Sequence, residues 1–144
     1  MLKNIPSVLS PALLKVLDEM GHGDEIVIGD GNFPAQSMGK NAIVIRADGH
    51  GVPVILDAIL QVMPLDQYTA KPVALMEVVP GDDCKPTIWE EYRRLLAKHD
   101  PDHSEIIMME RFAFYERAQK AYAIIATGET EIYANVLLKK GVVK

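Results

Sequence analysis

The sequence is short of the features that mark extracellular, membrane-spanning and nucleic-acid-binding proteins. Its 144 residues contain one cysteine, Cys84, which cannot form an internal disulfide, so a reducing, cytoplasmic setting is expected. No stretch reaches the roughly 18 consecutive apolar residues of a membrane-spanning helix, and the N-terminal residues do not resemble a secretory signal. Fifteen Lys and Arg against 20 Asp and Glu give a net charge of −5. This charge argues against nucleic acid or an anionic membrane as the main partner.

The usual motifs of cofactor-dependent and metal-dependent enzymes are also missing. Glycine-rich nucleotide loops and the G-x-S-x-G motif of serine hydrolases do not occur. His99 and His103 are four residues apart, but a proline between them interrupts the helix that would align them as metal ligands. The lone cysteine has acidic neighbours, Asp82 and Asp83, which make it a poor nucleophile. We therefore expect no metal and no cofactor.

What is present is the composition of an ordinary globular protein, with 49% apolar and 24% charged residues. The apolar share hints that some of these residues lie in subunit interfaces, because a small protein has much surface for its volume. The length suits one domain, and no linker divides the chain, so residues 1–144 are expected to form a single domain.

The pattern of apolar residues predicts alternating helices and strands. Helical spacing and cap residues predict helices over residues 11–20, 52–63, 87–98 and 112–120. Short apolar runs predict strands over residues 25–28, 43–45, 73–79, 106–109, 122–126 and 133–138. Thr87 to Glu90 matches a capping box, and Thr127 to Thr130 is predicted to close a hairpin between the last two strands. The alternation indicates the α/β class.

The densest polar segment is Gly21-His22-Gly23-Asp24, where a predicted helix gives way to a strand. Glycines on both sides leave the His22 imidazole accessible, and an imidazole titrates near neutral pH, so His22 can act as an acid or a base. The alternative is a helix C-terminus at which His22 interacts with the helix dipole.

Two aspartates follow predicted strands or helices. Asp30 ends an apolar strand and opens a loop, which is where open α/β sheets place ligands. A turn aspartate that bonds its own backbone is an equally good interpretation of Asp30. For Asp66, in a loop after Pro64, a turn or N-cap role is favoured by the residues alone.

Two further groups combine polar and aromatic side chains. Arg111 and Tyr115 are four residues apart and share a face if this segment is helical. Tyr133 and Asn135 lie on one side of the predicted last strand, because side chains alternate. A phenol and an amide beside an aromatic ring suit a sugar, although surface solvation explains the same pattern.

Taken together and in order along the chain, several segments resemble the fucose mutarotase branch of the family that also contains ribose pyranase. The matching segments include Met20-Gly21-His22-Gly23-Asp24-Glu25-Ile26, Asn32-Phe33-Pro34-Ala35, Ile45-Arg46-Ala47-Asp48-Gly49, Pro64-Leu65-Asp66, Met76-Glu77-Val78-Val79-Pro80, Phe114-Tyr115-Glu116-Arg117-Ala118 and Ala126-Thr127-Gly128-Glu129-Thr130. Ala134 departs from the branch, which often has Gly there, and agrees with the ribose-type members.

The resemblance implies an enzyme that interconverts the α and β anomers of a reducing sugar. The fucose mutarotase branch implies that this sugar is L-fucose. It also implies a compact RbsD-like α/β subunit, with a mixed sheet flanked by helices, in a ring-shaped oligomer that is often a decamer. The roles that it implies are His22 as general acid, Tyr133 as a further proton-transfer group, and Asp30, Asp66, Arg111, Tyr115, Tyr133 and Asn135 as substrate contacts.

Two alternatives stay open at this point. One is a ribose pyranase-type enzyme acting on ribose or another monosaccharide. The other is a non-catalytic monosaccharide-binding protein on the same fold. Ring opening needs one group that takes the anomeric proton and one that protonates the ring oxygen, which requires no metal and no cofactor. Asp30, Tyr133 or a held water are all candidates for the partner of His22.

Overall fold

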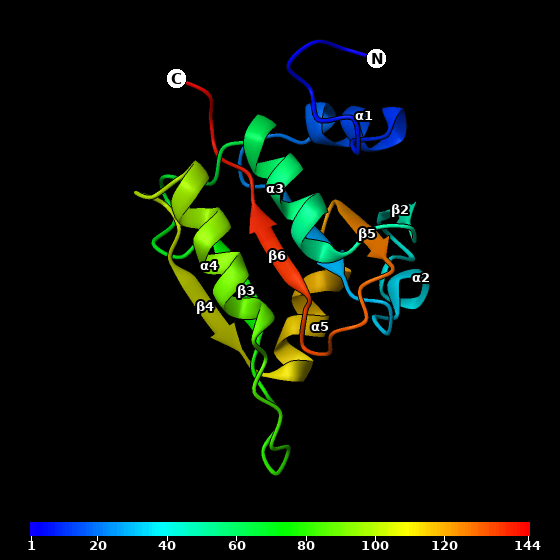
Figure 1. Cartoon of the computed structure of the whole chain (residues 1–144), viewed down its shortest axis with the longest axis vertical. Helices are drawn as coiled ribbons and strands as arrows, with labels where there is room; N and C mark the ends of the chain where they lie inside the picture. Colours follow the sequence, from blue (N-terminus) through cyan, green and yellow to red (C-terminus); the bar gives the residue numbers. More distant parts are fainter.

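A six-stranded mixed β-sheet organises the chain in the computed structural model, which describes residues 1–144 (Figure 1). The strand order is β2-β5-β1-β6-β3-β4. The strands are β1 (Glu25–Gly29), β2 (Ile43–Ala47), β3 (Val73–Met76), β4 (Ile106–Met109), β5 (Ala123–Thr127) and β6 (Val136–Lys139). β6 runs antiparallel to both of its neighbours, β1 and β3, whereas the other neighbouring pairs are parallel. The predicted α/β class with a mixed sheet is confirmed.

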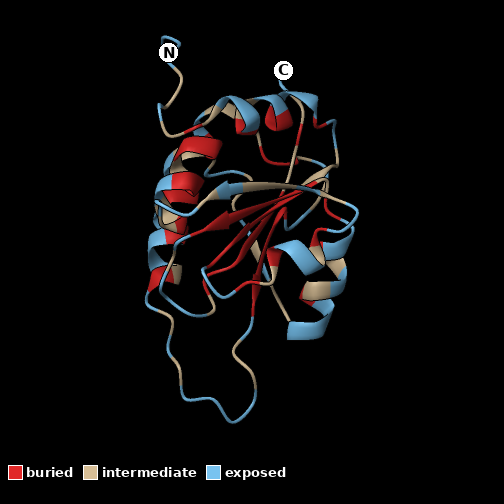
Figure 2. Cartoon of the chain, turned by 90° about the vertical axis from the view of Figure 1, so that its right-hand side faces the viewer, coloured by how far each residue is buried: buried red, intermediate tan, exposed pale blue.

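Helices cover both faces of this sheet. They are α1 (Pro11–Glu19), α2 (Ala35–Met38), α3 (Val52–Val62), α4 (Ile88–His99) and α5 (Arg111–Gln119). The larger hydrophobic core lies between the sheet and α1, α3 and α4, and it includes Ile26 and Ile28. The smaller core, with α2 and α5, includes Val27. Alternate residues of β1 thus enter opposite cores, and all three are fully buried, as the buried strands in Figure 2 illustrate.

The two predicted helix starts at Ser10 and Thr87 have different outcomes. The Ser10 hydroxyl accepts a hydrogen bond from the Leu13 N–H at 3.2 Å, which caps α1 as expected. The capping box at Thr87 is wrong, because the Thr87 side chain makes no capping bond. Its backbone is already helical, with φ −69° and ψ −24°, whereas an N-cap residue needs an extended backbone to turn its side chain onto the helix.

The predicted hairpin between the last two strands is also wrong. β1 lies between β5 and β6, so the segment after Thr127 passes the end of β1 rather than closing a turn. On the way, the Glu129 carbonyl accepts from the Gly31 N–H at 2.8 Å, and the Glu129 carboxylate accepts from the Val52 N–H at the start of α3. This longer path lets β1, which is apolar on both faces, take a fully hydrogen-bonded central position.

Two predicted strands are shorter than expected, each at the end that approaches the candidate site. β3 ends at Met76, because Glu77 is exposed and leaves the buried sheet. β6 begins at Val136 and not at Tyr133, because Tyr133 has a φ of 56°. That left-handed conformation is incompatible with a strand and unusual for a residue with a side chain.

Gly128 is needed where β5 ends beside the loop after β2. A Cβ at this position would lie 2.0 Å from the Asp48 carbonyl oxygen, whereas a Cβ at Gly49 would meet nothing within 4 Å. We expect Gly128→Ala to lower the free energy of unfolding by about 1–3 kcal/mol, as other overpacking changes do. Gly49→Ala, the matched control, should change it by less than about 0.5 kcal/mol. Urea unfolding of both variants measures the difference, and equal midpoints would contradict the close approach.

Candidate active site

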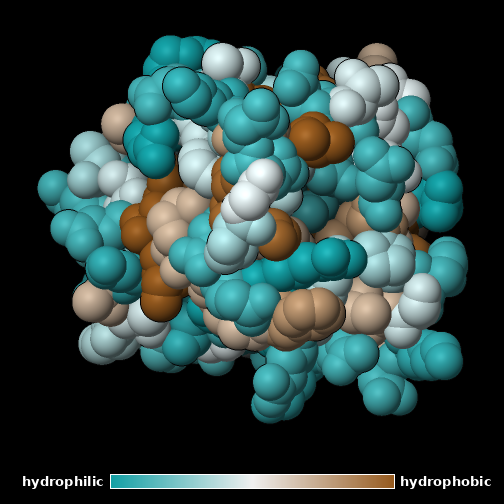
Figure 3. Space-filling view, turned by 90° about the horizontal axis from the view of Figure 1, so that it is seen from below, coloured by the Kyte–Doolittle hydropathy of each residue, from teal (hydrophilic) through white to brown (hydrophobic).

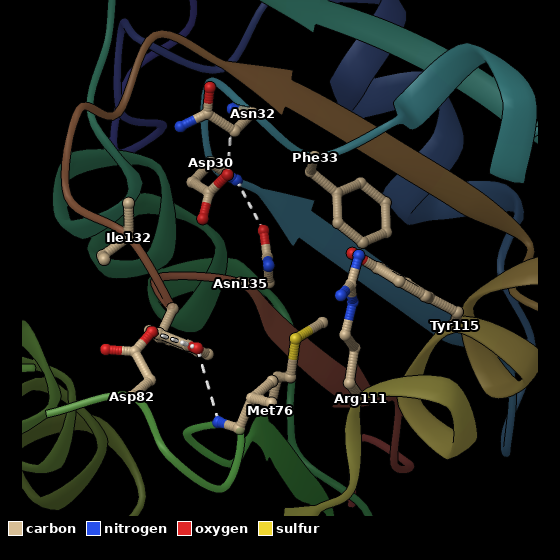
Figure 4. Close-up of a pocket in the computed structure, with 11 residues that line it drawn as sticks. Asp30, Asn32, Phe33, Met76, Asp82, Arg111, Tyr115, Ile132 and Asn135 are labelled. Carbon is tan, nitrogen blue, oxygen red and sulfur yellow. Dashed lines mark hydrogen bonds between the residues drawn. The ribbon is translucent and has the colours of Figure 1, made fainter. Parts of the chain in front are cut away.

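A pocket opens at the edge of the sheet where β1 and β3 end. Its volume is about 250 Å³, near the lower end for ligand pockets, so a small polar molecule suits it better than a nucleotide. It is lined by Asp30, Asn32, Phe33, Met76, Val79, Asp82, Arg111, Tyr115, Ile132, Tyr133 and Asn135 (Figure 4). Figure 3 shows the molecule from the end at which these strands finish, where a mostly hydrophilic surface contains small separate groups of hydrophobic residues.

Asp30 is the buried carboxylate of this pocket, with its residue 5% exposed. Its two oxygens accept from the backbone N–H groups of Asn32, at 3.0 Å, and Ala134, at 3.3 Å. Its own N–H donates to the Asn135 side-chain oxygen at 2.8 Å. Burial raises the pKa of Asp30, and the backbone hydrogen bonds offset part of that rise. The turn role and the pocket position considered from sequence are therefore both real.

Tyr133 is held in its unusual conformation by α4. The Trp89 indole N–H donates to the Tyr133 carbonyl at 2.8 Å, and the Tyr92 hydroxyl donates to the next carbonyl, Ala134, at 2.7 Å. The Tyr133 hydroxyl donates to the Asp82 carboxylate at 2.7 Å. That hydrogen bond, together with burial, raises the pKa of Tyr133. A left-handed residue supported in this way is typical of a functional site.

Arg111 reaches the pocket from the first turn of α5. Glu110 caps this helix, its carboxylate accepting from the N–H groups of Phe112 and Ala113 at 3.0 and 3.1 Å. The guanidinium carbon lies 5.5 Å from the centre of the Tyr115 ring, and Figure 4 shows the side chain extending toward Tyr115. Arg111 has no acidic partner within 4.0 Å, so its donors stay available to a ligand.

His22 and Asp66 lie outside this pocket. The His22 Nε2 and the Asp66 Oδ1 are 2.9 Å apart, and the Asp66 side chain is only 2% exposed. His22 precedes β1 and Asp30 follows it, and β1 spans about 13 Å at roughly 3.3 Å per residue. The structure therefore divides the predicted site residues into two clusters at opposite ends of one strand.

Asp66 is held as an ionised carboxylate. The Thr69 hydroxyl and the Tyr68 N–H both donate to it, and the Lys139 Nζ lies 3.8 Å away. Burial opposes ionisation, but these hydrogen bonds and the one with His22 outweigh it and lower the pKa of Asp66 to about 2. The carboxylate fixes one nitrogen of His22 and leaves the other, Nδ1, without a hydrogen-bond partner in the chain.

The sequence also allowed His22 to interact with the dipole at the C-terminus of α1, but another residue occupies that position. The Lys140 Nζ donates to the carbonyls of Leu17 and Met20 at the C-terminus of α1. Lys140 was not predicted, because its neighbours in the chain give no sign that β6 ends beside α1.

Two other pocket features were not predicted from sequence. Asp82 was considered only as a neighbour of Cys84, and the contact with Tyr133 spans 51 residues of sequence. Phe33 and Met76 supply apolar lining, whereas Phe112 is 69% exposed and lies outside the pocket.

For metal ions, no group of three or more His, Cys, Asp or Glu side chains is placed to bind one. None of the helices has the length and apolar character to span a bilayer.

An α/β subunit with a carboxylate, a guanidinium, a phenol and an amide around a small pocket is built to bind a small polar molecule. The family model of the RbsD/FucU transport proteins matches residues 3–143. The chain belongs to the RbsD/FucU family.

Individual relatives are similar over nearly their whole length. The fucose mutarotase of Mus musculus is 49% identical over 97% of this chain and 94% of its own. The crystal structure of FucU from Bifidobacterium longum is 58% identical, covers 99% of this chain and 100% of its own, and has a TM-score of 0.96. The fucose mutarotase of Streptococcus pneumoniae in complex with L-fucose is 52% identical with the same coverage and a TM-score of 0.93.

The low pKa of Asp66 predicts a pH-dependent contribution to stability. Its folded-state pKa of about 2 lies below the value of about 4 in an unfolded chain, so ionised Asp66 stabilises the fold above about pH 4. As the pH falls toward 2, this contribution, about 2 kcal/mol, is lost. The difference in unfolding free energy between the wild type and Asp66→Asn should therefore shrink over that interval. Asp18→Asn, at an exposed position, serves as the control, and a pH-independent difference for Asp66→Asn would contradict the assignment.

Proposed function

We propose that this protein is an L-fucose mutarotase, which interconverts the α and β anomers of L-fucose by opening and closing the sugar ring. The observation that carries the proposal is the pocket around Asp30, Arg111 and Tyr133, on a chain 52% identical to a fucose mutarotase whose crystal structure contains L-fucose. In this proposal residues 1–144 act as one sugar mutarotase domain in the cytoplasm.

The binding roles follow from which groups remain free to meet a sugar. Arg111 has unpaired donors for hydroxyl oxygens, while Asp30 and Asn135 are linked at 2.8 Å and offer carboxylate and amide groups. Tyr115 presents a ring that suits the apolar face of a sugar. Phe33 and Met76 offer apolar atoms to the methyl group of a 6-deoxy sugar.

The catalytic roles are assigned to His22 as general acid and Tyr133 as the second proton-transfer group. His22 has one nitrogen fixed by Asp66, and its side chain is 45% exposed. In the imidazolium form the other nitrogen also carries a proton, which it can give to a ring oxygen. Asp66 was expected to contact the sugar itself. Its burial and its bonds to Thr69 and His22 support a role through His22.

The separation of His22 from the pocket supports a catalytic site shared between subunits. β1 is a rigid, buried strand, so His22 and Asp30 of one chain cannot approach the same sugar. Exposed apolar residues stand beside both halves: Ile132 and Phe112 near the pocket and Tyr68, 5.3 Å from the His22 ring. We therefore propose a ring-shaped homo-oligomer, a decamer by analogy with the family, in which His22 of one subunit serves the pocket of its neighbour.

The alternatives differ in chemistry. A ribose pyranase-type enzyme would use the same acid and base on a pentose, and the present pocket does not exclude that substrate. A sugar-binding protein without activity needs no titrating group, and the buried Asp66 that fixes His22 weighs against it.

Replacing His22 tests the proposed reaction. We expect His22→Ala to lower the rate of α–β exchange by about 10²–10⁴-fold, because a positioned acid contributes that much. Saturation-transfer NMR measures the exchange with L-fucose, D-ribose and a galactose. The control is His50→Ala, since His50 is exposed and its side chain makes no hydrogen bond. A wild-type protein that binds L-fucose without exchanging it would overturn the proposal in favour of a binding protein.

Mixed oligomers test whether the site is shared. His22→Ala and Arg111→Ala should each be inactive alone, because each damages a different half of every site. When the two are unfolded and refolded together, random assortment should restore about a quarter of the sites. Recovery of activity in the mixture, followed by the same NMR exchange, is the expected result. A mixture no more active than its components would place His22 and Arg111 in one subunit's site or in none.

A further inference from the structure

Asp82 borders the pocket from the loop between β3 and α4, and the binding and catalytic roles proposed above do not include it. One of its carboxylate oxygens, Oδ1, accepts from the Cys84 N–H at 2.9 Å, which turns the loop back on itself. The other, Oδ2, accepts from the Tyr133 hydroxyl at 2.7 Å. The close-up in Figure 4 shows Asp82 at the rim of the pocket, opposite Asn32 and below Ile132. One side chain therefore joins an exposed loop to the phenol.

The direction of this hydrogen bond limits what Tyr133 can do. An ionised carboxylate only accepts, so the single phenolic proton points to Asp82. The Val79 N–H donates to the same phenolic oxygen at 3.3 Å, drawn as a dashed line in Figure 4. With its proton committed to Asp82, Tyr133 can meet a sugar hydroxyl in the pocket only as an acceptor.

The backbone around Tyr133 keeps this arrangement rigid. Its left-handed φ of 56° is fixed by the hydrogen bond from Trp89, and the following carbonyl is fixed by Tyr92. The backbone therefore cannot carry the phenol away from Asp82 without breaking these hydrogen bonds, and the hydrogen bond to Asp82 sets the direction of the phenolic proton.

We propose that Asp82 is a positioning residue that makes Tyr133 the proton acceptor of the reaction. The inference rests on the proposed mutarotase function. In the ring-opening step the anomeric hydroxyl gives its proton to the Tyr133 oxygen as the phenolic proton moves to the Asp82 Oδ2. The electron pair of the anomeric O–H bond forms the aldehyde C=O, the bond from C1 to the ring oxygen breaks, and that oxygen takes a proton from His22. Closure on the other face reverses every transfer, so no proton is gained or lost.

No other titratable side chain competes for the hydrogen bond between Asp82 and Tyr133. The other titratable groups that border the pair lie just after β1, on α5 and in the two loops: Asp30, Arg111, Tyr115, Cys84 and Glu131. None of their side chains hydrogen-bonds Asp82 or the Tyr133 hydroxyl. The bond from Tyr133 holds the pKa of Asp82 below its usual range, so Asp82 is ionised and ready to accept at neutral pH.

The variant that tests the relay is Asp82→Asn, with Asp83→Asn as the matched control. Asn is of the same size, but it cannot take up a proton. We expect the maximal exchange rate at pH 7 to fall about 10- to 100-fold with KM unchanged, at the low end of general-base effects. Asp83→Asn removes the same charge one residue away, where the side chain makes no hydrogen bond, and it should retain the wild-type rate.

The pH profile separates a proton relay from a merely structural role. The ratio of the Asp83→Asn rate to the wild-type rate should be constant from about pH 5 to 9, because Asp82 is ionised in both and His22 is the same in both. For Asp82→Asn the ratio to the wild-type rate should rise with pH as Tyr133 begins to ionise toward its ordinary pKa of about 10. Adding Tyr133→Phe should abolish that rise, and in this background Asp82→Asn should cost nothing further.

Each outcome is decisive. A pH profile for Asp82→Asn that equals that of Asp83→Asn would overturn the relay while leaving the mutarotase proposal intact. An additive loss in the double variant would also overturn it, because Asp82 would then act independently of Tyr133. A wild-type protein without anomer exchange on any sugar would instead refute the proposed function on which the relay rests.

Discussion

The central strand β1 is the constraint on which the site depends. Its three inner residues, Ile26, Val27 and Ile28, are fully buried. The strand is hydrogen-bonded to β5 on one side and to β6 on the other. A strand held in this way cannot bend or slide, so its two ends are held about 13 Å apart. His22 belongs to one end and Asp30 to the other. The fold thereby separates an imidazole from the pocket that it is proposed to serve, and the proposed association of subunits would join them.

The two ends of β1 also give their carboxylates opposite electrostatic settings. Asp30 is buried among backbone donors with a raised pKa, whereas Asp66 receives enough hydrogen bonds to lower its pKa to about 2. Environments that shift the pKa values of two carboxylates in opposite directions suit the two groups to different tasks. Asp66 stays ionised and orients His22, while Asp30 remains with Asn135 in the pocket. The backbone link from Asp30 to Asn135 ties the end of β1 to the segment that carries Tyr133.

The sequence predicted the local elements well because their signals are local. Ser10-Pro11 starts α1, and the apolar run at Ile26 to Ile28 is a buried strand. The order of strands was not predictable in the same way, since nothing between Thr127 and Val136 states that β1 will separate β5 from β6. Motifs in the sequence predicted the residues of the candidate site. Their division into two clusters depends on which end of β1 each residue adjoins, which the motifs do not indicate. Asp82 and Lys140 were missed because each acts across more than 50 residues of sequence.

The lining of the pocket also bears on how selective such an enzyme would be. Apolar atoms of Phe33 and Met76 can receive the methyl group of a 6-deoxy sugar, yet an apolar surface rejects an added hydroxyl by only about 10²-fold. Strong discrimination needs polar groups that would be left unpaired by the wrong sugar. In this pocket those groups are Asp30, Arg111 and Asn135, which in the proposed complex would contact hydroxyls and not the methyl. Selectivity should therefore arise mainly from the configuration of the ring hydroxyls, with the sixth carbon contributing a smaller preference.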